Sequence, residues 1–233
     1  MHSRRTFLGG AGALLASTTL SEARDLCAVY NKDTQAAMTP EQALANLKAG
    51  NVRFTSGKPL RCDLRAQVKA TAQGQYPFAS VLGCMDSRVP PELVFDQHIG
   101  DIFVVRVAGN VVDIDVLGSL EYATKVVGTK LVVVLGHTQC GAVKGAIEQL
   151  ELGNLTALLN NIRPACLEVT GVEGPRDVKN SRFVEAVVER NARDSVNALT
   201  THSQLMADLV AEKKLLIVPA VHDISTGVVS WLV

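Results

Sequence analysis

Two short segments of the sequence hold side chains that could bind a metal ion. The first is Cys84-Met85-Asp86-Ser87-Arg88, and the second is His137-Thr138-Gln139-Cys140. Together they offer two thiols, one imidazole and one carboxylate, a set of donors that suits zinc. Two cysteines and one histidine leave a fourth tetrahedral position, which either Asp86 or a water molecule can occupy. Three protein ligands with one open position are typical of a catalytic zinc site, whereas structural zinc sites are closed.

Each of these residues also has an ordinary structural interpretation. A buried cysteine commonly serves as a small hydrophobic residue, and a histidine after a strand is often structural. Asp86 and Arg88 could form a surface salt bridge worth about 0–1 kcal/mol. For one residue alone the structural interpretation is favoured. Two such pairs at strand ends of one sheet instead favour a metal site.

The chemistry expected of such a site follows from charge. Zinc lowers the pKa of a bound water molecule from about 15.7 toward about 7, which provides hydroxide near neutral pH. Two thiolate ligands donate more negative charge than imidazoles would, so we expect that pKa to lie above 7 and activity to favour alkaline pH. Asp86, held by Arg88 in a charge-assisted pair, is expected to accept a hydrogen bond from the hydroxide and orient it.

The elements that must position these side chains can be read from the apolar runs. Four short runs predict buried strands, at residues 78–83, 102–107, 131–135 and 215–221. Helical patterns precede and separate them, at residues 40–56, 64–73, 116–127, 140–150 and 182–198. This alternation predicts an α/β fold with a mostly parallel central sheet flanked by helices. Active groups of such sheets sit just beyond the carboxyl ends of the strands, which is where Cys84 and His137 fall.

The first 23 residues have the features of a signal peptide. Arg4 and Arg5 precede a Gly-rich apolar run from Phe7 to Leu20, and Ser21-Glu22-Ala23 fits a cleavage site. We therefore predict a twin-arginine signal at residues 1–23 and a mature catalytic domain at 24–233, exported to the periplasm or an equivalent compartment. An uncleaved anchor or a buried helix is the alternative. The run is short for a bilayer span of about 20 residues, and its glycines suit a core helix poorly.

The composition is that of one globular domain without a net charge that would attract charged partners. The chain has 233 residues, 47% of them hydrophobic and 20% charged, which excludes a disordered chain. Basic and acidic residues both number 23, so no net charge attracts nucleic acid or an anionic membrane. We expect neither a nucleic-acid partner nor stable membrane insertion after the signal is cleaved.

Three further cysteines, Cys27, Cys62 and Cys166, match no ligand position. In an oxidising compartment two of them could pair, and Cys27 with Cys62 is the more plausible pair because both lie in the N-terminal part. The sequence alone leaves the connectivity open. Three histidines could shuttle protons, although solvated or structural histidines are commoner: His98, His202 and His222. The single tryptophan, Trp231, is expected to pack at an interface or at the edge of the core.

The two metal-binding segments resemble those of the β-carbonic anhydrase family. That family shows Cys-x-Asp-Ser-Arg and then Gly-His-x-x-Cys-Gly, which stand here at residues 84–88 and 136–141. Further matching stretches lie at residues 89–92, 100–106, 108–110 and 118–122. The resemblance extends from about residue 39 to the C-terminus. It implies that a zinc-bound hydroxide attacks CO₂, so that CO₂ is reversibly hydrated to bicarbonate and a proton.

The resemblance also implies a role for each site residue. Cys84, His137 and Cys140 correspond to the zinc ligands, and Asp86 with Arg88 corresponds to the catalytic dyad. Asp86 can also occupy the fourth metal position in an inactive state of the family. Three residues correspond to the substrate-binding positions: Gln75, Phe103 and Gly109. Phe103 would be contributed across a dimer interface.

The assembly and the branch of the family can be inferred in the same way. Members form dimers, often paired into tetramers, with an N-terminal helical arm that residues 40–56 resemble. Val81 stands where one branch has the tryptophan of a regulatory bicarbonate pocket. We therefore expect the plant-like branch, with an open zinc and without that regulation. A tyrosine of that branch has no clear counterpart here, and Asp113 lies near its place.

Two other functions are compatible with the same residues. Hydrolysis of carbonyl sulfide or carbon disulfide is known on this scaffold, because these linear substrates are attacked in a similar way. A catalytically silent zinc-binding or anion-binding module is the other alternative. Against it, every ligand and dyad residue is present in the sequence.

Overall fold

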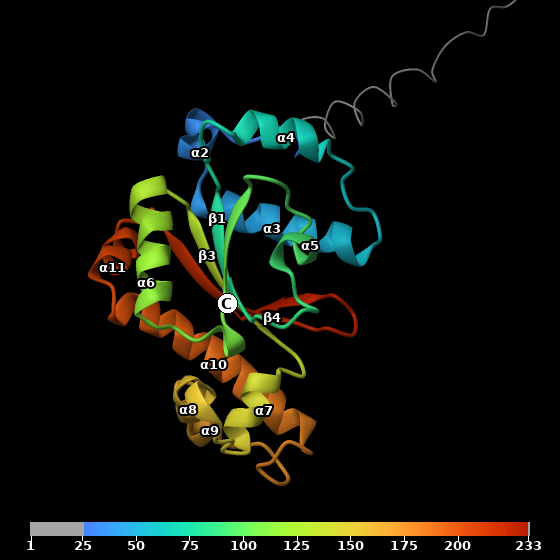
Figure 1. Cartoon of the computed structure of the whole chain (residues 1–233), viewed down its shortest axis with the longest axis vertical. Helices are drawn as coiled ribbons and strands as arrows, with labels where there is room; N and C mark the ends of the chain where they lie inside the picture. Colours follow the sequence, from blue (N-terminus) through green and yellow to red (C-terminus); the bar gives the residue numbers. More distant parts are fainter. Residues whose placement is uncertain (1–25, 233) are drawn as a thin grey trace, which may run out of the picture.

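The computed structural model describes residues 26–232, so the predicted signal peptide lies outside the described residues. Its centre is a five-stranded sheet in the order β2-β1-β3-β4-β5 (Figure 1). The strands are β1 (Ala79–Gly83), β2 (Ile102–Arg106), β3 (Leu131–His137), β4 (Leu216–His222) and β5 (Val229–Trp231). The pairs β1–β2, β1–β3 and β3–β4 are parallel, whereas β4–β5 is antiparallel. The predicted mostly parallel α/β fold is confirmed.

The central strands are apolar throughout because both faces of the sheet are covered. Successive side chains of a strand point to opposite faces. Leu131, Val133 and Leu135 of β3 therefore pack in one core cluster, while Val132 and Val134 pack in another. Every residue of β1 and β3 is buried. This explains why each strand appears in the sequence as a continuous apolar run rather than an alternating one.

Among the described residues, the N-terminal part contains the helices α2 (Lys32–Ala37), α3 (Pro40–Thr55), α4 (Leu64–Thr71) and α5 (Pro91–Val94). Helix α3 begins at Pro40, as predicted, and Thr39 caps it. Thr39 Oγ1 accepts a hydrogen bond from the Gln42 backbone N–H, and Gln42 Oε1 accepts one from the Thr39 N–H. This reciprocal pair satisfies two of the amide groups that the first turn leaves without helical partners.

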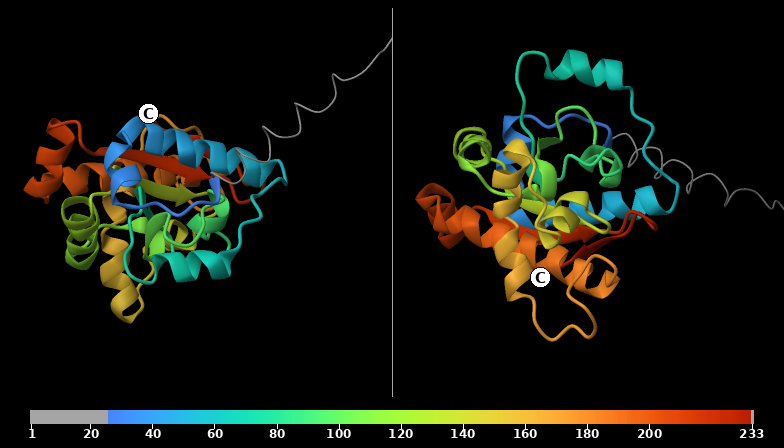
Figure 2. Two further views of the ribbon diagram at one scale, coloured as in Figure 1. Left: turned by 90° about the horizontal axis from the view of Figure 1, so that it is seen from above. Right: turned by 60° about the horizontal axis from the view of Figure 1, so that its bottom comes forward.

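Helix α3 packs against the sheet of its own chain. Ala43 and Leu47 are fully buried in a cluster with Phe78 and Phe95, and the left view of Figure 2 shows α3 along the sheet. Gly50 lies so close to the carbonyl of Phe95 that a Cβ atom would overlap it. The helix that resembled an arm around a partner is thus part of its own domain's core. Only its opposite face remains for a partner.

The C-terminal half supplies the remaining helical segments, which are η1 (Ala108–Asn110), α6 (Ile114–Glu121), η2 (Tyr122–Val127), α7 (Gly141–Ile147), α8 (Gly153–Asn160), α9 (Arg163–Glu168), α10 (Ser181–Thr201) and α11 (Gln204–Ala211). The predicted helix at 116–127 is α6 followed by η2, a π-helical segment. Helix α10 crosses β3 and β4 on the face opposite α3. Between residues 26 and 232, none of the helices combines the length and apolar composition needed to span a bilayer.

The edge formed by β5 was not predicted. This strand has only three residues, too few for a periodic pattern. Beside it, Pro219 lies within β4, and its carbonyl accepts a hydrogen bond from the Leu232 N–H. Trp231 on β5 packs against Phe95, with ring centroids 5.9 Å apart. The expected position of the tryptophan at the edge of the core is therefore confirmed.

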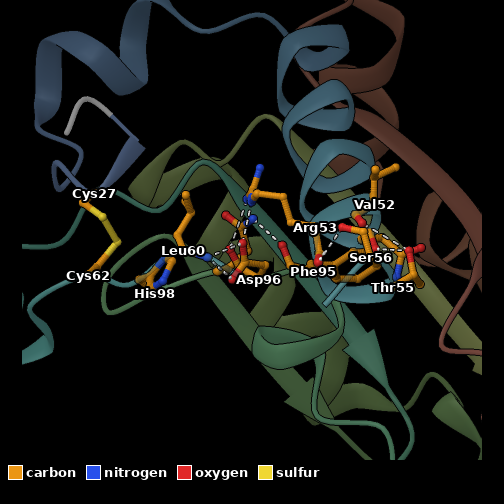
Figure 3. Close-up of polar contacts among 12 residues, drawn as sticks. Cys27, Val52, Arg53, Thr55, Ser56, Leu60, Cys62, Phe95, Asp96 and His98 are labelled. Atoms are coloured by element: carbon orange, nitrogen blue, oxygen red, sulfur yellow. Dashed lines mark hydrogen bonds and ion pairs between the residues drawn. A yellow bond between two sulfur atoms is a disulfide. The ribbon is translucent and has the colours of Figure 1, made fainter. Parts of the chain in front are cut away.

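A disulfide joins Cys27 to Cys62, the pairing that the sequence favoured, while Cys166 is free. Leu26 and Leu60, close to the two cysteines in the chain, line one pocket with His98. Figure 3 shows the disulfide on the His98 side of this region and the Arg53–Asp96 ion pair beyond Leu60. His98 lies shortly before Ile102, the first residue of β2. The disulfide is therefore at the amino ends of the parallel strands. It encloses α2 and α3 in one covalent loop.

Candidate metal centre

Three predicted ligands come together at the carboxyl ends of β1 and β3. Cys84 directly follows β1, His137 is the last residue of β3, and Cys140 precedes α7. The two strands are parallel neighbours, so their carboxyl ends meet at one edge of the sheet. The two Sγ atoms and the histidine nitrogen all lie within 4.8 Å of one another. All three residues are at most 4% exposed.

The orientation of His137 suits a metal ligand. Its Nδ1 lies 2.9 Å from the Thr138 carbonyl oxygen, which requires Nδ1 to carry the proton. The Nε2 atom then has a free lone pair, and it is buried without a hydrogen-bond partner. Zinc binds histidine nitrogen at about 2.0 Å and cysteine sulfur at about 2.3 Å. An orphaned imidazole nitrogen beside two buried sulfur atoms therefore fits a tetrahedral zinc ion.

The two thiols differ in their electrostatics. The pKa of Cys84 is lowered, first by a hydrogen bond with Cys140 and then by His137 and the Gly109 and Asp86 backbone. The pKa of Cys140 is raised by the same pairing, by burial and by the negative charge on Cys84. The shared hydrogen bond therefore makes Cys84 the more acidic of the two thiols. A metal cation bound at this point would stabilise both as thiolates.

Asp86 forms a bidentate ion pair with Arg88 beside the three ligands. Arg88 Nε donates to Oδ1 at 2.9 Å and Nη2 donates to Oδ2 at 2.7 Å. This pairing is the main reason that the pKa of the Asp86 carboxyl lies well below its usual range. Asp86 Oδ2 is 4.0 Å from His137 Nε2. An anionic carboxylate with a fixed orientation therefore stands at the edge of the ligand cluster.

Arg106, to which the sequence gave no role, holds the turn that carries Cys84 and Asp86. Its Nε donates to the Cys84 carbonyl at 2.9 Å, and its Nη2 donates to the Asp86 carbonyl. The guanidinium thus binds the backbone on both sides of Met85, whose side chain is 65% exposed. The pairing of Arg106 with Gly83 across the parallel strands brings these groups together. That register is a tertiary feature, which spacing in the sequence does not reveal.

Gly109 lies against Cys84, as part of the short segment η1. Its N–H donates to Cys84 Sγ at 3.3 Å, and its φ of 69° is in the left-handed region that favours glycine. A Cβ atom at this position would lie 2.5 Å from Ile162 Cδ1. Gly109 therefore borders the metal cluster, and no other residue type fits there without displacement.

Gln75 and Phe103 are placed elsewhere in the single chain. Gln75 is exposed in the loop before β1. Phe103 on β2 lines a groove of about 600 Å³ between β2, α6 and η2, where its ring lies 6.3 Å from that of Tyr122. Asp113, near the place of the missing tyrosine, caps α6 by accepting a hydrogen bond from the Val116 N–H at 2.8 Å.

Of the three spare histidines, His222 lies nearest to the cluster. It is the β4 partner of His137 in the sheet register. Both of its ring nitrogens are buried without partners, and burial is the main cause of its lowered pKa. Burial therefore favours the neutral form of this imidazole.

Solved structures with this fold include the β-carbonic anhydrase CcaA, with a TM-score of 0.64 and 25% identity over 72% of this chain and 84% of that one. The Coccomyxa β-carbonic anhydrase in complex with acetazolamide has a TM-score of 0.63 and 26% identity, covering 72% of this chain and 77% of that one. The family model for carbonic anhydrase matches residues 79–229. The chain belongs to the β-carbonic anhydrase family.

Curated members of the family cover the sequence well. Carbonic anhydrase 2 of Mycobacterium tuberculosis is 37% identical over 194 residues, which span 81% of this chain and 90% of that protein. A carbonic anhydrase of Mycolicibacterium smegmatis is 50% identical over 117 residues, half of this chain and 57% of that protein. The matched segment of the family model includes both metal-binding segments of this β-carbonic anhydrase.

Proposed function

We propose that this chain catalyses the reversible hydration of CO₂ to bicarbonate and a proton, with zinc held by Cys84, His137 and Cys140. The observation that carries the proposal is the buried Cys-His-Cys cluster within 4.8 Å, beside an ion-paired carboxylate. A zinc ion bound there would supply a hydroxide nucleophile near neutral pH. Membership of the carbonic anhydrase family supports CO₂ as the substrate.

The chain's own residues then orient the reaction. Asp86 is anionic, so its carboxylate would accept a hydrogen bond from a hydroxyl group held at the site and would orient it. Arg88 keeps that carboxylate in place through two parallel hydrogen bonds. The two hydrogen bonds from Arg88 would have to weaken or rearrange if Asp86 turned toward the fourth ligand position. This arrangement supports the open-site form of the enzyme as our proposal.

We propose a second copy of the chain as the partner, in a homodimer or a dimer of dimers. The groove at Phe103 is apolar, and it is bordered by the exposed side chains of Ile114 and Tyr122. Gln75 and Phe103 would serve as substrate-binding residues of the neighbouring copy's site. Related folds include two β-carbonic anhydrases of Sordaria macrospora that are described as tetrameric.

We also propose export by the twin-arginine route, with residues 1–23 as the signal and the periplasm as the destination. The Cys27–Cys62 disulfide supports this proposal, because disulfides persist in oxidising compartments and are rare in the cytosol. Expression with and without Arg4 and Arg5 replaced by lysine, followed by fractionation, tests it. Retention of the double variant in the cytosol is expected, and equal export of both forms would contradict the proposal.

Stopped-flow measurement of CO₂ hydration tests the catalytic proposal. Purified protein spanning residues 24–233 is assayed at alkaline pH with one zinc per chain, after chelation, and after zinc is restored. Fast turnover that is lost on chelation and regained with zinc is expected. No CO₂ turnover with zinc fully bound would contradict the proposal. Hydrolysis of carbonyl sulfide by the same sample would then identify the sulfur analogues as substrates.

A further inference from the structure

Helix α10 places two buried polar side chains against the loop that borders Cys84. Asn191 is 3% exposed and Ser195 is 6% exposed. Asn191 Nδ2 donates to the Gly109 carbonyl at 2.8 Å, and Ser195 Oγ donates to the Asn110 carbonyl at 3.2 Å. The neighbouring inward residues of the helix are apolar, among them Val187, Val188 and Ala192. Burying a polar side chain in an apolar face costs free energy unless it is hydrogen-bonded. The folded protein therefore favours keeping both of these hydrogen bonds.

Gly109 connects Asn191 to the metal cluster. Its carbonyl accepts from Asn191, and its own N–H donates to Cys84 Sγ at 3.3 Å. Both groups belong to one residue whose φ is 69°. Holding the carbonyl therefore fixes the direction of the N–H. The loop is confined on the other side by Ile162, which leaves no room for a Cβ atom on Gly109.

We propose that Asn191 is a positioning residue for the metal centre, acting through Gly109 to keep an N–H···S hydrogen bond on Cys84. A hydrogen bond to a thiolate withdraws electron density from the sulfur. Cys84 consequently donates less charge to a bound metal than a bare thiolate would. Partners outside the ligand set tune metal sites in this way, and their loss costs about 10–100-fold in metal affinity or activity. The inference rests on the metal site assigned under the proposed function.

The chain offers a matched control for this role. Ser195 lies one turn after Asn191 on α10 and donates to the adjacent carbonyl of the same loop, that of Asn110. The backbone hydrogen bond to Cys84 Sγ comes from Gly109 rather than from Asn110. Ser195→Ala removes a comparable buried hydrogen bond without releasing Gly109. Asn191→Leu removes the amide donor while keeping the branching and the number of side-chain heavy atoms, whereas Asn191→Ala also creates a cavity.

The experiment uses the full mature chain loaded with Co²⁺ or Zn²⁺. In the Co²⁺ form, the sulfur-to-cobalt charge-transfer band is expected to move to lower energy in both Asn191 variants and to stay in place in Ser195→Ala. Competition with a chelator should show zinc affinity lowered about tenfold or more in the Asn191 variants, because Cys84 is then no longer held in position before the metal binds, and this loss outweighs the stronger donation from the sulfur. Unchanged bands and affinity in folded Asn191 variants would overturn the inference. An equal shift in Ser195→Ala would do so as well.

A measurement on the unmodified protein covers the case in which the variants do not fold. In the ¹¹³Cd-loaded wild type, scalar coupling between the Gly109 amide proton and cadmium is expected through the N–H···S bond. Its absence would overturn the inference. Failure of the proposed function has a different signature, because the wild type itself would then show no thiolate charge-transfer band or no CO₂ hydration.

Discussion

Removing the disulfide should destabilise the protein by an amount that can be worked out from the loop it closes. Cys27 and Cys62 are separated by 35 residues. For a loop of this length, the chain-entropy relation gives about 13 cal/mol/K, or about 4 kcal/mol at 25 °C. A domain of this kind has a free energy of unfolding of about 5–15 kcal/mol. The disulfide thus accounts for a large part of the free energy of unfolding.

The folded structure around the disulfide has other contacts that should survive reduction. Gln67 Nε2 donates to the Cys27 carbonyl at 3.0 Å, Gln35 Nε2 donates to the Pro77 carbonyl at 2.7 Å, and the Tyr30 ring lies 5.1 Å from that of Phe78. We therefore expect the loss to come mainly from the greater entropy of the unfolded chain. Catalysis should be unaffected, because the disulfide and the metal cluster lie at opposite ends of the parallel strands.

The assay is urea unfolding of the oxidised protein, the reduced protein and the double variant Cys27→Ser/Cys62→Ser, each at equal zinc content. The reduced form and the double variant should both lose about 4 kcal/mol, while kcat for CO₂ hydration at 25 °C stays within twofold. The half-buried thiol of Cys166 provides the control, since Cys166→Ser should leave the effect of reductant unchanged. A loss below about 1 kcal/mol, or a fall in kcat while the protein remains folded, would refute the reasoning.

Four further predictions concern the site and its surroundings. Asp86→Asn should lower kcat about 100-fold or more with zinc content unchanged; metal analysis showing lost zinc would contradict the dyad role. Arg106→Gln should lower kcat about tenfold with little change in KM, because Arg106 binds the backbone carbonyl of Cys84 and not the substrate. Steady-state kinetics that show a change in KM alone would argue against this. Gly109→Ala should cost about 2–4 kcal/mol in urea unfolding, from the left-handed backbone and the contact with Ile162; wild-type stability would show that the loop adapts. Burial raises the pKa of Asp101, so the folded protein binds a proton at this carboxyl more tightly than the unfolded chain does. Proton binding therefore stabilises the fold at low pH, and this stabilisation is lost as the pH rises through the pKa of the folded state. Asp101→Asn, which keeps an acceptor for the His98 N–H, should therefore gain stability relative to wild type more at pH 8 than at pH 4; an equal difference at both pH values would contradict this.

Much of the fold was predictable because the buried strands and the start of α3 leave clear patterns in the local sequence. The strands β1 and β3 are buried on both faces, so their sequences are uninterrupted apolar runs. Thr39 and Gln42 mark the start of α3 by local hydrogen bonds that depend on nothing distant. Cys84 and His137 were found for the same reason, since each stands where an apolar run ends.

What could not be predicted depends on contacts between distant segments. Arg106 reaches the turn after β1 only through the parallel register of two strands. Asn191 contacts a loop 82 residues earlier in the chain. The helical spacing places it on the buried face of α10, but it does not indicate which group Asn191 contacts. The substrate-binding roles of Gln75 and Phe103 stay predictions, because the contribution of a second chain to the site is itself only proposed.

The two edges of the sheet differ in a way that bears on self-association. At one edge, β5 offers only three residues, and the missing N–H of Pro219 falls on that side of β4. An incoming strand would find few groups to pair with there. At the other edge, β2 has five residues without proline and β1 as its strand neighbour in the described fold. A sheet with a single usable edge can be extended by one copy and then no further. Edge-to-edge pairing of this protein should therefore stop at a closed pair instead of growing into a fibre.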